Sequence, residues 1–135
     1  MEEAMSRETG HLEMIQAVIT RMAGNSFQMK GWSVALASAV TGFAASKESH
    51  LSVAAFTLVP AGAFWALDAY YLALERLYRA LYNKAVTQDP PTYLMNVGPV
   101  SPGLWASMLS RPAVAGIHIP MIVVIALVSL TGVLR

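Results

Sequence analysis

The sequence predicts an all-α integral membrane protein with an N-terminal amphipathic helix, three transmembrane helices and a cytoplasmic extension of the second. The first observation is composition: hydrophobic residues make up 56% of the 135 residues and charged residues only 13%, whereas charged residues form about 25% of an ordinary soluble domain. The second is that three stretches approach the roughly 20 apolar residues that a helix needs to cross a bilayer. The third is helical periodicity in the charged segments beside them.

Three stretches are the candidate spans, at 26–46, 51–72 and 113–134. The third is the clearest, because its run 119–134 contains no ionisable residue. A soluble helical bundle is the alternative, and we favour lipid because three such stretches leave little polar sequence to cover them. The connection 47–50 is short, so the first two spans are expected to form an antiparallel hairpin.

The basic residues predict the orientation of these spans, because lysine and arginine concentrate on the cytoplasmic side of a membrane. One predicted side, formed by the N-terminal region and 73–112, carries most of them. They are Arg7, Arg21, Lys30, Arg76, Arg79, Lys84 and Arg111. The other side has only Lys47 and Arg135. We therefore expect the N-terminus in the cytoplasm and the C-terminus outside.

Two parts follow from this pattern along the chain. A cytoplasmic amphipathic helix occupies 1–25, and a three-span membrane domain occupies 26–135, with its cytoplasmic stalk and loop at 73–112. The sequence AGNS at 23–26 contains turn-forming residues, so it predicts a break or kink between the N-terminal helix and the first span.

The N-terminal helix is predicted from apolar residues that recur at spacings of three and four. These residues are Leu12, Ile15, Ile19 and Met22. Such a face either packs on a neighbouring helix or lies on the membrane surface. We favour packing, because the acidic N-terminal tail gives little attraction for anionic lipid.

The second span is predicted to continue as a helix of about 30 residues or more that leaves the bilayer as a stalk. Two series at seven-residue spacing form an a/d seam through this helix. They are Phe64, Tyr71 and Tyr78, and Leu67, Leu74 and Leu81. Glu75 and Arg79 form an (i, i+4) pair in the favourable order. The seam either holds the N-terminal helix of the same chain or mediates self-association, and both readings stay open.

After the stalk, the Pro- and Gly-rich segment 87–103 predicts a loop. A short helix is expected at 101–111, with Ser101 as the N-cap, Pro102 at the first helical position and Pro112 ending it.

Small residues recur at spacings of three to four along the first span, at Ala35, Ala39 and Gly42. This spacing lets helix backbones approach closely in lipid. The pattern predicts helix packing first, within the chain or in a homo-oligomer, and a pore lining only if an oligomer wraps it around water.

Polar residues inside the spans are the candidate functional site. Counting along the helices at ~1.5 Å per residue places Asp68, His118 and Lys30 in one layer, roughly 5–8 Å below the cytoplasmic boundary. Ionisable groups in a span usually face protein or water. One reading is structural, in which Asp68 pairs with Lys30 or accepts from a tyrosine hydroxyl, and His118 is a neutral donor. The other is a cation or proton site at a pore mouth.

Other classes of function are not indicated. A net charge of +1 gives no nucleic-acid-binding surface, and the lack of cysteine excludes thiol chemistry and cysteine-ligated zinc. One carboxylate and one histidine fall short of a metal-ligand set. No nucleophile elbow, HExxH motif or phosphate-binding glycine loop is present. We therefore expect no enzyme activity, catalytic residue, metal or cofactor.

Two segments, HLEMIQAVITRMAGNSFQMKGWSVAL at 11–36 and FWALDAYYLALERLYRALY at 64–82, carry a resemblance. The pairing of NSFxxKGW with LDAYYLxxERLYRxLY resembles a family of small, largely uncharacterised bacterial three-span membrane proteins. The resemblance implies a multi-pass protein of the bacterial inner membrane. It also implies a place among antiphage defence effectors.

From these observations, we expect a homo-oligomeric inner-membrane protein that forms or gates an ion-conducting pore. A chain with three spans has too few helices to enclose a path alone, which favours an oligomer in the lipid bilayer. The alternative is a non-conducting anchor or adaptor that recruits a cytoplasmic protein partner through 1–22 and 73–112.

Overall fold

The computed structural model describes residues 1–44, 51–87 and 93–133, which form four α-helices and no strand. The helices are α1 (Glu2–Ala44), α2 (Leu51–Thr87), α3 (Pro102–Leu109) and α4 (Pro112–Val133). The predicted all-α class is confirmed for these residues. The predicted connection at 47–50 lies outside them.

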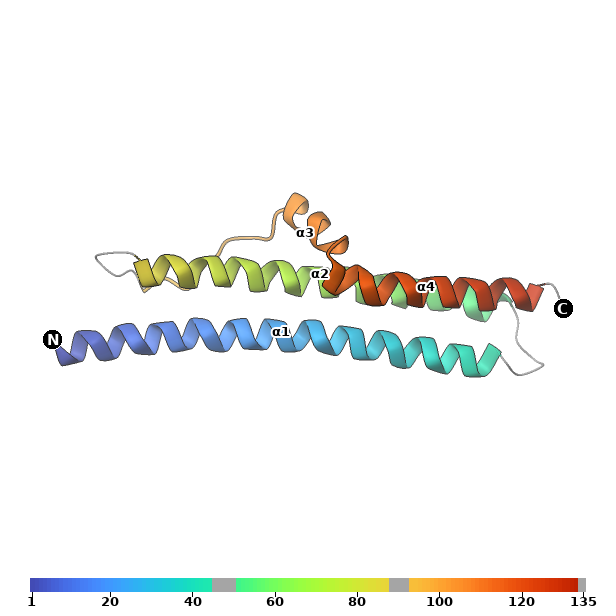
Figure 1. Cartoon of the computed structure of the whole chain (residues 1–135), viewed down its shortest axis with the longest axis horizontal. Coiled ribbons are helices and arrows are strands. Elements are labelled where there is room, and N and C mark those ends of the chain that lie inside the picture. The colour runs from blue at the N-terminus through green and yellow to red at the C-terminus, as the bar shows by residue number, and fades with distance from the viewer. Residues whose placement is uncertain (45–50, 88–92, 134–135) are drawn as a thin grey trace.

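The molecule is a long rod built on two antiparallel helices (Figure 1). α1 and α2 run side by side along its length, and α4 lies beside them over one half of the rod, parallel to α1 (Figure 1). α3 stands off the middle of the rod, where α4 begins (Figure 1). One half of the rod is therefore a three-helix bundle, and the other half is a two-helix hairpin.

α1 is one continuous helix of 43 residues, about 65 Å long at the α-helical rise. The break predicted at 23–26 is therefore wrong, and 1–25 shares its helix with the first part of 26–135. A glycine inside a helix costs only about 1 kcal/mol relative to alanine. Gly24 is tolerated because α1 packs along its partner on both sides of it, with Met22 and Ser26 both buried.

α2 is a continuous helix of 37 residues, as the sequence predicts for the span and its stalk. Pro60 lies inside it and Pro120 lies inside α4. Each proline removes one backbone hydrogen bond from its helix. Neither ends its helix, because the turns on both sides keep their hydrogen bonds.

The predicted short helix is confirmed as α3. Ser101 is its N-cap, and its hydroxyl accepts a hydrogen bond from the Leu104 amide at 3.2 Å. Two tryptophans hold α3 on the rod: the Trp105 indole donates to the Ala66 carbonyl at 3.0 Å, and the Trp65 indole donates to the Leu109 carbonyl at 3.2 Å. The angle between α3 and the rod is thus fixed by paired indole hydrogen bonds.

The N-cap gives a prediction of modest size. Replacing Ser101 by alanine removes the side-chain acceptor of the Leu104 amide in the first turn of α3. We expect the free energy of unfolding to fall by about 1 kcal/mol. Ser107→Ala is the matched control, because the Ser107 hydroxyl donates to the Leu104 carbonyl within the same helix and caps nothing. Chemical denaturation followed by circular dichroism measures both. Equal effects of the two substitutions would contradict the capping role.

Three small apolar clusters follow one another along the rod. In the two-helix half, Ile15 and Ile19 pack against Ala85, and Leu12, Tyr78 and Leu81 surround them. The predicted packing of the N-terminal helix face on its neighbour is confirmed by this cluster. The second cluster joins α3 and α4 to α2 and contains Ala69, Ala73, Met108 and Val114. The third joins α4 to the hairpin and contains Ala61, Met121 and Ile125.

By length and hydropathy, none of the described helices crosses a membrane on its own. The consecutive segments Pro102–Leu109 and Pro112–Val128, which meet at a bend of 61°, reach that threshold only as a pair.

Candidate functional site: a buried polar cluster between three helices

The candidate site is a group of four polar side chains at the point where α1, α2 and α4 meet. Asp68 on α2 is at its centre and has no exposed surface. Lys30 and Ser26 approach it from α1, and His118 approaches it from α4. One carboxylate therefore links three helices that are far apart in the sequence.

Both oxygens of the Asp68 carboxylate are engaged. Oδ1 lies 2.6 Å from Lys30 Nζ and also accepts a hydrogen bond from the Ser26 hydroxyl. Oδ2 lies 3.1 Å from Nε2 of His118. Lys30 Nζ also donates to Ser26 Oγ at 2.8 Å. An ionised carboxylate accepts hydrogen bonds only, so the three contacts around Asp68 all stabilise its charged form.

Helical spacing explains why these residues meet. Ser26 and Lys30 are four apart on α1 and therefore lie on one face. That face is directed at α2, because Met22 and Ser33, on the neighbouring turns, are also buried. Asp68 and its neighbour Ala69 are buried on the opposing face of α2. The register of the antiparallel hairpin then brings Lys30 level with Asp68.

The structure brings Asp68, His118 and Lys30 together in one cluster, while their predicted depth below a membrane boundary stays a prediction. Sequence reasoning missed Ser26, and it offered a tyrosine hydroxyl as the alternative donor, whereas the structure places a serine there. The signal was available: Ser26 lies one helical turn before Lys30, inside the NSFxxKGW motif. Whether this layer borders a pore stays a prediction.

His118 is completely buried and stacks on Trp65, with the ring centroids 6.4 Å apart and the planes 14° apart. Because the ionised Asp68 carboxylate cannot donate, Nε2 of His118 carries a proton and donates it to Oδ2. The other ring nitrogen, Nδ1, has no hydrogen-bond partner among the described residues. The histidine thus holds α4 to the hairpin through only one of its two nitrogens.

The predicted small-residue face does not pack within the chain. Ala35, Ala39 and Gly42 are exposed, and a Cβ added at Gly42 would meet no atom within 4 Å. Their predicted packing against another helix of the same chain is therefore wrong. The reason is rotational: α1 turns the face of Ser33 and Ala37 toward its neighbours, and the small residues lie away from it. Their role between subunits stays a prediction.

The predicted seam divides between two environments. Tyr78 and Leu81 pack against Ile15 and Ile19 of α1, so the C-terminal part of the seam holds the N-terminal part of α1 in the same chain. The other members do not belong to this cluster: Phe64, Tyr71 and Leu74 are half-buried, and Leu67 is exposed. Their part in self-association stays a prediction.

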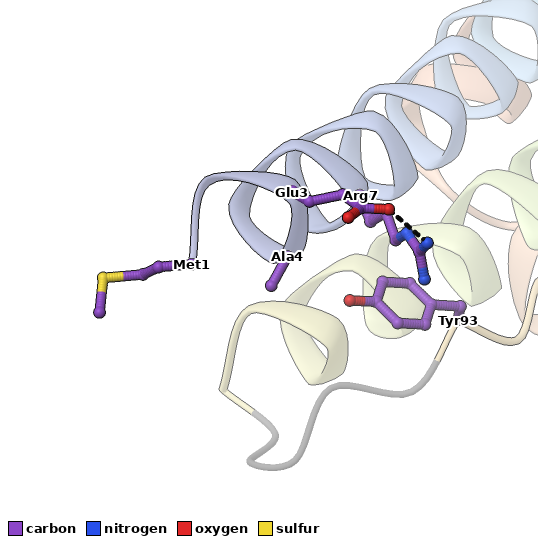
Figure 2. Close-up of a pocket in the computed structure, with 5 residues that line it drawn as sticks. All are labelled: Met1, Glu3, Ala4, Arg7 and Tyr93. Atoms are coloured by element: carbon purple, nitrogen blue, oxygen red, sulfur yellow. Dashed lines mark hydrogen bonds and ion pairs between the residues drawn. The ribbon is translucent and has the colours of Figure 1, made fainter.

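Surface hollows on the described part of the chain include two that lie away from the polar cluster and from the middle of the two-helix half. A groove between α1 and α4 is lined by Val34, Ala37, Ser38, Thr41, Pro120, Met121 and Val124. The other hollow lies at the N-terminal end of the rod, where Tyr93 faces Glu3 and Arg7 (Figure 2). Arg7 there donates to Glu3 at 2.7 Å (Figure 2). That ion pair is solvent-exposed, and such pairs contribute little to stability or recognition.

Comparison with models of known protein families, with curated proteins and with solved structures found no match to this chain. The functional interpretation therefore depends on the geometry of the chain itself.

Proposed function

We propose that this protein is a membrane anchor: the three-helix half of the rod lies in a lipid bilayer, and the two-helix half projects into the cytoplasm toward a protein partner. The observation that carries the proposal is the distribution of exposed apolar side chains. In the three-helix half, large apolar side chains face outward from all three helices. They include Phe27, Trp32, Phe43, Phe56, Val59, Leu67, Ile119, Val123, Leu127 and Leu130.

Large contiguous apolar surface is rare on soluble monomers, and it marks a membrane or protein contact when it occurs. Here the exposed apolar residues come from all three helices, which favours lipid over a single protein partner. α4 has 22 residues, about 33 Å at the α-helical rise, but among the described residues it meets the combined length and hydropathy of a span only together with α3. The proposal therefore places the bundle as a whole in the bilayer.

The other half of the rod also exposes apolar side chains, among them Met5, Met14 and Val86, but it differs in carrying many charges. Four carboxylates of α1 are exposed, at Glu2, Glu3, Glu8 and Glu13. The last turns of α2 expose Arg79 and Lys84. A surface with charges of both signs suits water and a polar partner, so this hairpin is the part that would be presented to the cytoplasm.

The polar cluster favours an anchor over a pore. Asp68 is enclosed by protein and already paired with Lys30 and His118, so it is not placed to shape the environment of a passing ion. Its contacts instead join the three helices that would share the bilayer. Polar side chains inside a membrane commonly hold helices together in this way.

An ion-conducting homo-oligomer is the second candidate. The observation that favours it is the groove between α1 and α4, which brings the Ser38 and Thr41 side chains to a surface that is otherwise apolar. Packing of several chains around this groove would enclose those hydroxyls. Cation flux into liposomes that contain the purified chain tests this candidate, and intact assemblies without flux would favour the anchor.

Single-cysteine labelling tests the anchor directly, because the natural chain contains no cysteine. Thr20→Cys and Asn83→Cys in the two-helix half should react with a charged maleimide in inside-out vesicles. Val59→Cys and Val123→Cys should stay unreactive there and react after the chain is unfolded in detergent. Free reaction of both pairs in the intact vesicles would contradict the proposed anchor.

A further inference from the structure

Two buried polar atoms beside the cluster have no hydrogen-bond partner among the described residues, and they lie on facing helices. Ser33 on α1 and His118 on α4 both have no exposed surface. Within the described chain, Ser33 Oγ and His118 Nδ1 make no hydrogen bond. Buried polar groups are satisfied in more than nine cases of ten, and a buried water is the usual partner where protein atoms are missing.

The register of the bundle places the two side chains at the same level. Ala37 of α1 packs against the cluster that contains Met121 of α4. Ser33 lies one turn before Ala37, and His118 lies one turn before Met121, each on the same face of its helix. α1 and α4 run parallel (Figure 1). One turn back along both helices therefore leads to the same layer.

The chemistry of the two atoms is complementary to water. In a neutral imidazole whose Nε2 holds the proton donated to Asp68, Nδ1 accepts a hydrogen bond. The Ser33 hydroxyl both donates and accepts. A water molecule between them would donate to Nδ1 and exchange a hydrogen bond with Ser33 Oγ.

We propose that Ser33 Oγ and His118 Nδ1 hold one bound water molecule, which completes the polar cluster. The water extends the contacts of Lys30 and Asp68 into one hydrogen-bonded chain through the bundle, ending on Ser33. Its hydrogen bond to Nδ1 also fixes the tautomer of His118. The hydrogen bond made by the second ring nitrogen of a metal-bound histidine has the same effect. The site takes a small neutral molecule that both donates and accepts hydrogen bonds.

Nuclear magnetic resonance of the full chain, labelled with ¹⁵N-histidine and held in lipid nanodiscs, tests this site. We expect Nε2 of His118 protonated, Nδ1 unprotonated, and a cross-peak from water to the His118 ring. Ser33→Ala should remove the cross-peak and shift the Nδ1 resonance, while the Nε2 resonance stays in place. Ser38→Ala is the matched control, because Ser38 lies on the same helix with its side chain exposed, and it should change neither.

Three results would overturn the water site. They are a protonated Nδ1, no water cross-peak in the unaltered chain, or a cross-peak that survives Ser33→Ala. The unchanged Nε2 resonance reports that the cluster is still folded in the variant. The site can fail while the membrane anchor holds, because incorporation into the nanodisc is measured independently.

Discussion

Asp68→Ala is expected to lower the free energy of unfolding by about 3–5 kcal/mol, the loss that follows when one partner of a buried ion pair is removed. Asp68 is fully buried, and its carboxylate engages Ser26, Lys30 and His118 at once. Its removal leaves the Lys30 ammonium, whose side chain is only 16% exposed, without a counter-charge. It also removes the contact between Asp68 and His118 that joins α4 to α2.

Denaturation in detergent micelles, followed by circular dichroism and tryptophan fluorescence, measures this loss. Lys30→Met combined with Asp68→Leu should recover much of the stability, because an apolar pair carries no uncompensated charge. Glu75→Ala is the matched control: Glu75 pairs with Arg79 at 2.8 Å on the same helix, and such (i, i+4) pairs contribute only about 0.3–0.5 kcal/mol. Losses of equal size at Asp68 and Glu75 would show that the cluster does not hold the bundle together.

Val59→Arg is expected to disfavour membrane insertion by about 2.5–3.5 kcal/mol, the cost of an arginine near the centre of a transmembrane helix. Val59 lies in the three-helix half and is 74% exposed. On a protein surrounded by water, the same exposed change would stay within about 0.5 kcal/mol. The cost of Val59→Arg therefore distinguishes a Val59 side chain that contacts lipid from one that contacts water.

Val86→Arg is the matched control for this test. It replaces the same residue type on the same helix, at a position that is 56% exposed in the two-helix half. We expect it to leave insertion unchanged, because Val86 would lie in the cytoplasm. Membrane fractionation with carbonate extraction measures both variants. If Val59→Arg remained in the membrane as fully as Val86→Arg, lipid contact at Val59 would be disproved.

The polar cluster shows that a sequence predicts the level of a residue along its helix but not the direction in which the helix turns its side chain. Counting residues along each span placed Asp68, His118 and Lys30 in one layer, because the helical rise is constant. The count carried no information on rotation, so it did not distinguish three side chains that touch from three that share a depth. Ser26 was missed for the same reason: a serine shows no periodic signal, and only its position one turn from Lys30 relates it to Asp68.

In the N-terminal helix, one prediction from local sequence is confirmed and another is overridden by packing. The Ile15 and Ile19 face was readable from its spacing, and it packs on α2 as expected. The break at 23–26 was also a local inference, from residues that favour turns in an isolated chain. It failed because α2 lies along α1 through this region, and such packing outweighs a cost of about 1 kcal/mol at a glycine.

The sequence by itself determined the all-α class, the continuous second helix, the capped short helix after the loop, and the common level of Asp68, His118 and Lys30 along their helices. Each of these follows from local propensity or from a fixed rise along one helix. Only the tertiary structure decided that α1 is unbroken, that Ser33 and not Ala35 or Ala39 faces the bundle, and that Asp68 joins three helices. These depend on the rotation and register of helices against one another, which many weak contacts from distant parts of the chain set together.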